Sequence, residues 1–220
     1  MTNGNRRIEQ MLAEVGLPTT SFGERLAGLA EAPRQLHKAL FRALLDTGTS
    51  SDLSSILATY GLDSDVTACL EQLTAANLIA VDEHGFITGV FPLSARPTRH
   101  SVEIEGGRTV SAMCAVDALA VPAMLDRGAT LRSTDPLTGR SITVKVDGRK
   151  LSWEPASAVV VLGRVGDGPI AVACCAHIDF YADEASAGRA LTIVNGIMLT
   201  VPAARDLGDA VFAGLGTRVS

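Results

Sequence analysis

Hydrophobic residues recur at helical spacing through the first third of the chain. The pattern is weak over residues 1–30, where Pro18 interrupts it, and strengthens after Pro33, a residue suited to the first turn of a helix. It predicts three helices, one starting at Pro33, one ending at Gly61 and one running from Ser64 to Leu78. Two β-type runs follow, at 78–81 and 85–90, around a turn-forming Asp-Glu-His-Gly sequence. Three helices and a hairpin are typical of a winged-helix module.

The pattern changes to strand-like alternation after residue 100. Residues 91–100 are the predicted linker, because Pro92 and Pro97 disfavour helix there. The predicted strands are 101–105, 108–112, 130–133, 141–147, 158–162, 171–175 and 191–201. The predicted helices are 114–125, 184–190 and 203–215. We therefore expect an α+β protein, with a winged-helix-like helical module at 1–95 and, at 96–220, a mixed or antiparallel sheet with flanking helices.

Composition and charge narrow the classes of partner. The 220 residues are 47% hydrophobic and 20% charged, with a net charge of −5, which is an ordinary globular composition. Residues 1–95 carry six Lys and Arg against eleven Asp and Glu, so the acidic excess lies on the helical module. A DNA-reading module normally has a basic face, so we expect no nucleic-acid partner.

The expected cellular compartment rests on two features that are not found in the sequence, a membrane-spanning run and a signal peptide. No apolar run is long enough to span a membrane, and the polar Met1–Gln10 stretch is unlike a signal peptide, so we expect a cytoplasmic protein without a membrane partner. Cysteines in that compartment stay reduced, and they are catalytic, metal-binding or buried.

One candidate for chemistry is the pair Cys114 and Asp117, three residues apart. If Cys114 begins a helix, both side chains lie on one face, and the positive helix end favours a low-pKa thiolate. The alternative is that Cys114 is a small core residue in an Ala-rich helix.

The second candidate is the run from Cys174 to Tyr181, read as a strand. Alternation would place Cys175, His177 and Asp179 on a polar face and Cys174 toward the core. The alternative is a buried strand containing one satisfied histidine. The sequence has no CxxC or HExxH zinc motif and no GxGxxG, P-loop or GxSxG motif, although two or three thiolates could hold a soft metal. Cys69, in the third predicted helix, is most simply a core residue.

Taken together, these runs resemble the organomercurial lyases (alkylmercury lyases). That family has a winged-helix-like N-terminal part and an α+β catalytic domain, with a Cys-Ala-hydrophobic-Asp run opening a helix and a later Cys-x-His-x-x-Phe-aromatic run. The first is similar to residues 114–117, with Pro122 at the family's distance, and the second to residues 175–181. The likeness covers roughly residues 30–215 and is strongest over 100–182.

The resemblance implies roles for three residues. Cys114 and Asp117 match the family's first cysteine and aspartate, and Cys175 matches its second cysteine when the following His and Phe-aromatic pair align without a gap. Two positions depart from the family. Met113 stands where an aromatic is common and is expected to reshape the pocket, and Asp135 stands near a cysteine that the family treats as structural.

The activity that the resemblance implies is protonolysis of a carbon–mercury bond to a hydrocarbon and Hg(II). Mercury would bind Cys114 and Cys175, with Asp117 as its neighbour and proton carrier. No cofactor is expected; the implied partners are organomercury compounds, low-molecular-weight thiols and a mercuric reductase that collects Hg(II). Two alternatives stay open: a relative that handles another organometal or binds a soft metal without cleavage, and a metal-responsive winged-helix regulator.

Overall fold

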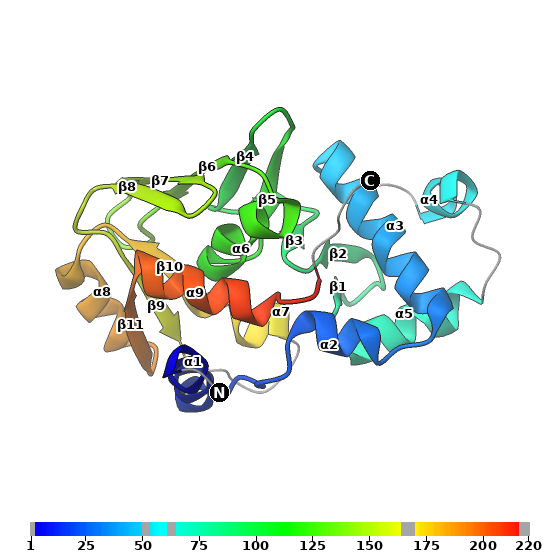
Figure 1. Ribbon diagram of the computed structural model, residues 1–220, viewed down its shortest axis with the longest axis horizontal. Coiled ribbons are helices and arrows are strands. Elements are labelled where there is room, and N and C mark those ends of the chain that lie inside the picture. The colour runs from blue at the N-terminus through cyan, green and yellow to red at the C-terminus, as the bar shows by residue number, and fades with distance from the viewer. Residues whose placement is uncertain (1–2, 50–52, 61–64, 164–169, 216–220) are drawn as a thin grey trace.

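The computed structural model describes residues 3–49, 53–60, 65–163 and 170–215 (Figure 1). The helices are α1 (Asn3–Val15), α2 (Phe22–Ala27), α3 (Glu31–Thr47), α4 (Leu53–Tyr60), α5 (Val66–Ala75), α6 (Ala115–Leu125), α7 (Ile170–Ala173), α8 (Glu184–Leu191) and α9 (Val201–Val211), with a 3-10 turn, η1 (Cys175–His177). The strands are β1 (Ile79–Val81), β2 (Ile87–Val90), β3 (Leu93–Ser94), β4 (Ser101–Ile104), β5 (Thr109–Ala112), β6 (Ala129–Thr134), β7 (Ser141–Asp147), β8 (Lys150–Glu154), β9 (Val159–Gly163), β10 (Ile178–Tyr181) and β11 (Gly196–Thr200).

The strands form two antiparallel sheets, and the expected α+β class is confirmed. The larger sheet has eight strands in the order β1-β2-β3-β5-β4-β6-β7-β8, and the smaller has the order β10-β9-β11. Strand β3 arises inside the predicted linker, where Leu93 pairs with Val90 on one side and Ala112 on the other. The large sheet therefore runs without interruption across the predicted domain boundary at residue 95, and the division at that point stays a prediction.

The N-terminal helices and the hairpin occur where the hydrophobic spacing placed them. Helix α5 is capped by Asp65, whose side chain accepts a hydrogen bond from the backbone N–H of Ala68, whereas Ser64 and Gly61 lie outside the described residues. Strand β8 was not predicted from sequence. It lies at the edge of the large sheet and pairs with β7; its residues alternate between exposed and half-buried positions, and none of them is fully buried.

The predicted strand at 171–175 is wrong. Helix α7 and the 3-10 turn η1 occupy this stretch, and the strand begins only at Ile178. A short apolar run fits a buried helix turn as well as a strand, and periodicity alone does not separate the two.

Helix α6 is the centre of the molecule. It contacts α9 on one side and strands β4, β5, β6 and β10 on the others, and Figure 1 shows it between the large sheet and α9. Residues 115–121 are at most 4% exposed, so the helix is apolar all round rather than amphipathic. One continuous hydrophobic core joins side chains of α1, α3, α6, α9 and the large sheet. Among the N-terminal helices, α1 packs on α9 and β11, and α3 packs on β2 and β3.

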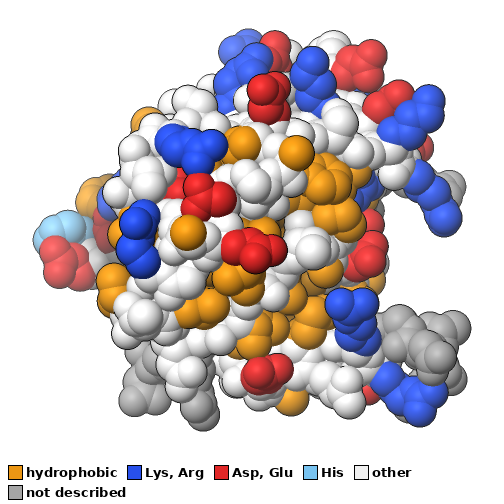
Figure 2. All heavy atoms as spheres, turned by 90° about the vertical axis from the view of Figure 1, so that its left-hand side faces the viewer, with side chains coloured by type: hydrophobic (Ala, Val, Ile, Leu, Met, Phe, Trp, Pro, Cys, Tyr) orange, Lys and Arg blue, Asp and Glu red, His pale blue; other side chains and the backbone are white. Residues whose placement is uncertain are grey.

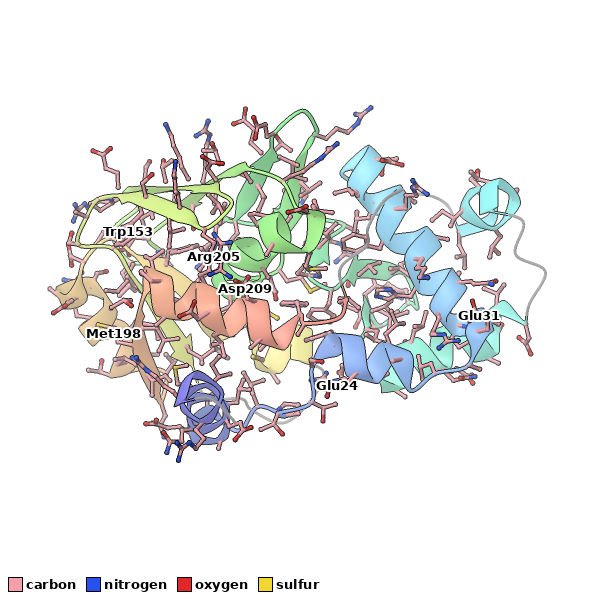
Figure 3. All side chains as sticks on the ribbon, in the orientation of Figure 1. Glu24, Glu31, Trp153, Met198, Arg205 and Asp209 are labelled. Atoms are coloured by element: carbon pink, nitrogen blue, oxygen red, sulfur yellow. The ribbon has the colours of Figure 1, made fainter. Side chains whose placement is uncertain are left out.

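Helix α9 is held against α6 and against the β7–β8 turn. Arg205 Nη2 donates to the backbone O of Gly148 at 3.0 Å, and Arg205 Nε lies 3.6 Å from Asp209 Oδ2 (Figure 3). One turn further along α9, a Cβ on Gly208 would lie 2.9 Å from the backbone O of Val116 and 3.3 Å from Ala120 Cβ. Glycine at 208 is therefore what allows α9 to approach the helix that begins at Cys114.

Gly208→Ala is expected to destabilise the protein by about 1–3 kcal/mol, because the added methyl group meets backbone atoms of α6. A matched control is Gly188→Ala in α8, where a Cβ meets nothing within 4 Å. That change is expected to stabilise by about 0.5–1 kcal/mol through helix propensity. Urea unfolding measures both, and equal effects of the two changes would contradict the close α6–α9 contact.

The surface that includes α8 and β11 carries charges of both signs between hydrophobic side chains (Figure 2). Ile193, just after α8, is 77% exposed there. Within the described ranges, no helix combines the length and the apolarity that crossing a membrane requires.

Candidate functional site

Cys114 is the residue that caps α6. Its backbone is extended, with φ −150° and ψ 179°, and its Sγ accepts a hydrogen bond from the backbone N–H of Asp117 at 3.4 Å. A side-chain acceptor at the N-cap reaches the third residue of a helix, which explains why Cys and Asp stand three apart. Asp117 therefore lies in the first turn of α6, buried with Cys114 at 4% and 1% exposure.

Cys175 approaches from the other side of the site. It opens the turn η1, between α7 and β10, and β10 packs against α6. Its Sγ donates to Asp117 Oδ2 at 3.6 Å, and the ligand atoms of Cys114, Asp117 and Cys175 all lie within 4.8 Å of one another. The structure thus brings together the two runs that the sequence placed in one site.

The other polar residues of the second run lie elsewhere. Because Cys175–His177 is a 3-10 turn, the predicted alternation of Cys175, His177 and Asp179 on one strand face is wrong, and His177 is exposed. Asp179 instead accepts from Arg99 Nη1 at 3.0 Å and lies 3.2 Å from His100 Nε2. Neither His177 nor Asp179 belongs to the cluster of possible metal ligands.

Burial dominates the electrostatics of the site. It raises the pKa of Asp117 to about 7, against hydrogen bonds from Cys114 and Cys175 that act to lower it. Burial also raises the pKa of Cys114 to about 12, and the nearby Asp117 carboxylate adds to that effect. The pKa of Cys175 is raised well above its ordinary value by hydrogen bonding with Cys114 and Cys174 and by burial.

The expected low-pKa thiolate at Cys114 is therefore wrong for the metal-free protein. The helix terminus does contribute a backbone N–H to Cys114 Sγ, but loss of solvent outweighs it. Both thiols of the cluster are protonated at neutral pH, while Asp117 is poised between its two states. A soft cation that binds the sulfurs must displace their protons, and Asp117 is the adjacent acceptor.

The cluster lines a small cavity of about 40 Å³. Apart from the site residues, its lining is apolar with one exception, Arg25 of α2. The lining residues are Leu12, Leu17, Pro18, Phe22, Arg25, Phe91, Cys114, Val116, Asp117, Leu162, Cys174, Cys175, Ile178, Leu207 and Val211. The segment from α1 to α2 therefore covers the cysteines. This contact was not predicted from the sequence, because no motif marks a contact between segments so far apart in the chain.

Three further residues that the sequence singled out lie in different surroundings. Cys174 lies in the hydrophobic core at 2% exposure, as expected, and it also lines the cavity beside Cys175. Met113 was expected to reshape the pocket, but it is not among the described residues that line the cavity. Its side chain instead lies over Gly89 of β2. Cys69 is buried in α5, as expected of a core residue.

Asp135 has a structural environment. It is 1% exposed, and its carboxylate accepts hydrogen bonds from the backbone N–H groups of Leu137, Thr138 and Ala182 at 2.8, 3.1 and 3.0 Å. These bonds join the turn after β6 to the residue that follows β10. A carboxylate thus links these segments near the place where the resemblance implies a structural cysteine.

The donor set of the cluster suits a soft ion. Two sulfurs and one carboxylate oxygen converge in a mostly apolar, buried space. Thiolates select soft ions such as Hg(II), Cu(I) and Zn(II) over Mg(II) and Ca(II), and two sulfurs on opposite sides satisfy a linear ion.

Comparisons with known proteins point to one family. A family model described as alkylmercury lyase matches residues 93–213. The alkylmercury lyase of Bacillus cereus is 30% identical over 188 residues, which is 82% of each chain. That of Pseudomonas putida is 35% identical over 120 residues, 54% of this chain and 56% of the other. A solved structure described as the mercury-bound form of MerB2 shares the fold, with a TM-score of 0.71, 22% identity, and coverage of 98% of this chain and all of the other.

Proposed function

Because this chain belongs to the alkylmercury lyase family, we propose that it cleaves the carbon–mercury bond of organomercury compounds by protonolysis. The observation that carries the proposal is the cluster itself, in which two thiols and a carboxyl group lie within 4.8 Å of one another and out of water. Cys114 and Cys175 hold mercury, and Asp117 moves the proton. The products are a hydrocarbon and Hg(II).

The proton balance assigns each group a step. A thiol of the site displaces the ligand X from R–Hg–X, and its proton leaves with X. The second thiol then binds mercury and gives its proton to the Asp117 carboxylate. Cys175 is the better donor for this transfer because its Sγ already donates to Asp117 Oδ2. Asp117 next protonates the carbon, and the electron pair of the Hg–C bond forms the new C–H bond. Mercury remains on two thiolates, and Asp117 is again ionised.

The buried setting favours this sequence. A second thiolate raises the electron density at mercury and weakens its bond to carbon. The apolar lining keeps out water, which would otherwise compete for the proton and solvate the carboxylate. A pKa of about 7 lets Asp117 accept a proton from a metal-bound thiol and still act as an acid toward carbon.

Product release requires an external group. Two buried thiolates hold Hg(II) tightly, so low-molecular-weight thiols, or a mercuric reductase that offers its own thiols, must remove it for a second turnover. The chemistry needs no organic cofactor.

The direct test is to incubate the reduced protein with phenylmercury or methylmercury and excess thiol, and to measure benzene or methane by gas chromatography. We expect hydrocarbon well above a thiol-only control. Tight binding of the organomercurial with no hydrocarbon above that control would instead support a soft-metal-binding relative.

The rate of cleavage is expected to depend on pH through Asp117. The carboxylate must be ionised in the free protein to receive a thiol proton, and its pKa is about 7. The value of kcat/KM should therefore rise with pH and reach half its plateau near neutrality. The measurement is kcat/KM for phenylmercury from pH 5 to 9, and a flat profile, or one that falls over this range, would contradict the role of Asp117 as proton acceptor.

A further inference from the structure

Arg25 lies at the mouth of the cavity. Most residues that line the cavity are buried, and those that keep a substantially exposed portion are Leu17, Pro18, Arg25 and Val211. Among these four, Arg25 is the one charged residue. Arg25 is therefore the charged group that a ligand entering the cavity between these residues can meet.

The guanidinium group of Arg25 is held in place, and no carboxylate of the described residues pairs with it. Its Nε and Nη2 donate to the backbone O of Thr20 at 3.2 and 3.0 Å, and its Cζ lies 4.6 Å from the ring centroid of Phe22. Nη1 makes no hydrogen bond to any described residue, and no described carboxylate pairs with the group. Burial without a nearby anion lowers the pKa of Arg25, although the side chain stays cationic at neutral pH.

The nearest acidic neighbour in sequence is already engaged. Glu24 Oε2 accepts hydrogen bonds from Ser21 N and Oγ at 2.8 and 3.0 Å (Figure 3). Glu24 lines a wider groove of about 670 Å³, which also contains Glu9 and shares Leu12, Pro18 and Val211 with the cavity wall. Arg25 itself lines the cavity and not the groove. The positive charge thus lines the same cavity as the thiols, and the two carboxylates line the neighbouring groove.

We propose that Arg25 binds a carboxylate carried by the mercury compound as mercury reaches the cysteines. The inference rests on the proposed function and names a class of ligand for the same site. A guanidinium group that is already oriented binds carboxylates at low entropic cost. The carboxylate can come from either side of mercury: from the thiol that carries the organomercurial in solution, or from its organic group.

Three substrates separate these sources. Phenylmercury carried by 2-mercaptoethanol has no carboxylate, and phenylmercury carried by 3-mercaptopropionate has one on the thiol. The third, 4-mercuribenzoate carried by 2-mercaptoethanol, has one on the organic group. The variants are Arg25→Gln, Arg25→Lys, which keeps the charge, and Arg132→Gln as a control. Arg132 is exposed on β6 and pairs with Glu103.

The quantity to compare is the ratio of kcat/KM for each carboxylate-bearing substrate to kcat/KM for the neutral one. In Arg25→Gln this ratio should fall about tenfold to a hundredfold for at least one carboxylate source, the loss expected for one charge-assisted hydrogen bond. Arg25→Lys should restore part of the ratio, and Arg132→Gln should leave it unchanged. An unchanged ratio in Arg25→Gln overturns the proposal, even if all three rates fall together, because that result assigns Arg25 to packing alone.

A second readout does not depend on cleavage. The rate at which each compound blocks the site thiols, measured by stopped-flow loss of free thiol, should show the same dependence on Arg25. If no hydrocarbon forms but capture still depends on the carboxylate and on Arg25, the lyase activity fails and the carboxylate site stands. If hydrocarbon forms and the rate of capture does not depend on the carboxylate, the lyase activity stands and the carboxylate site at Arg25 fails.

Discussion

Cys114→Ser is expected to lower hydrocarbon formation from phenylmercury by roughly 10⁴-fold or more, the scale of loss seen when a nucleophile is removed from an enzyme. A hydroxyl group is a hard ligand that binds Hg(II) poorly, so the variant leaves mercury with one sulfur and a strong Hg–C bond. Serine is also a good N-cap, and it can accept the hydrogen bond from Asp117 N that Cys114 Sγ accepts now. The substitution should therefore remove the chemistry and leave α6 in place.

Two companion variants make this result specific. Cys175→Ser should be as inactive as Cys114→Ser, since the two sulfurs act on one metal. Cys69→Ala removes another buried thiol, in α5, that is not part of the cluster, and it should keep the wild-type rate. Hydrocarbon is measured by gas chromatography, and circular dichroism checks the fold. Wild-type activity in either serine variant would exclude that cysteine from the reaction.

Asp117→Asn is expected to have two opposite effects, a loss of activity and a gain in stability. Asparagine can accept a hydrogen bond from Cys175 but cannot take up or deliver the proton, so the rate should fall by about 10²–10⁴-fold. Above pH 7, the free energy of unfolding of Asp117→Asn should exceed that of the wild type by a few kcal/mol, because the neutral amide removes a buried charge.

The pH dependence of that gain follows from the raised pKa. Asp117 has a pKa of about 7 in the folded protein against 3.8 for an ordinary aspartate, so the folded state binds the proton more tightly than the unfolded state does. Its contribution to stability is present at low pH and is lost as pH rises through about 7, at a cost on the order of 4 kcal/mol. Asp117→Asn should therefore match the wild type near pH 4 and exceed it near pH 8.

Urea unfolding of both proteins at pH 4 and pH 8 measures this difference. Equal stabilities at pH 8 would show that the Asp117 carboxylate is not held at an energetic cost, and retained activity in Asp117→Asn would exclude it as the proton carrier. A loss of activity together with a gain in stability is the result expected where a catalytic group is kept in a buried position that lowers the stability of the protein.

Local patterns were sufficient to predict much of the fold. The leucine spacing after Pro33 and the alternation after residue 100 located most helices and strands, because many of these elements bury one face against a continuous core. The spacing of Cys114 and Asp117 also led to the correct local geometry, since it is the spacing of an N-cap and the residue it bonds. These features depend on residues close together in sequence.

What the sequence could not predict depends on contacts between distant segments. The cover of the cavity by Leu12, Phe22 and Arg25 arises only when α1 and α2 pack onto α6 and α9. The same packing decides the protonation of the site, because the balance between the helix terminus and burial at Cys114 depends on how much water the covering segment excludes. The 3-10 turn at Cys175 was read as a strand because its apolar neighbours suit either structure.

The most direct test of the proposed chemistry is a single turnover without added thiol. The reduced protein is mixed with one equivalent of phenylmercury in deuterium oxide, and both benzene and protein-bound mercury are measured. We expect one equivalent of singly deuterated benzene and one Hg(II) retained per protein, with the Cys114 and Cys175 thiols no longer free. Retention of intact phenylmercury, without benzene, would contradict carbon–mercury cleavage by this protein.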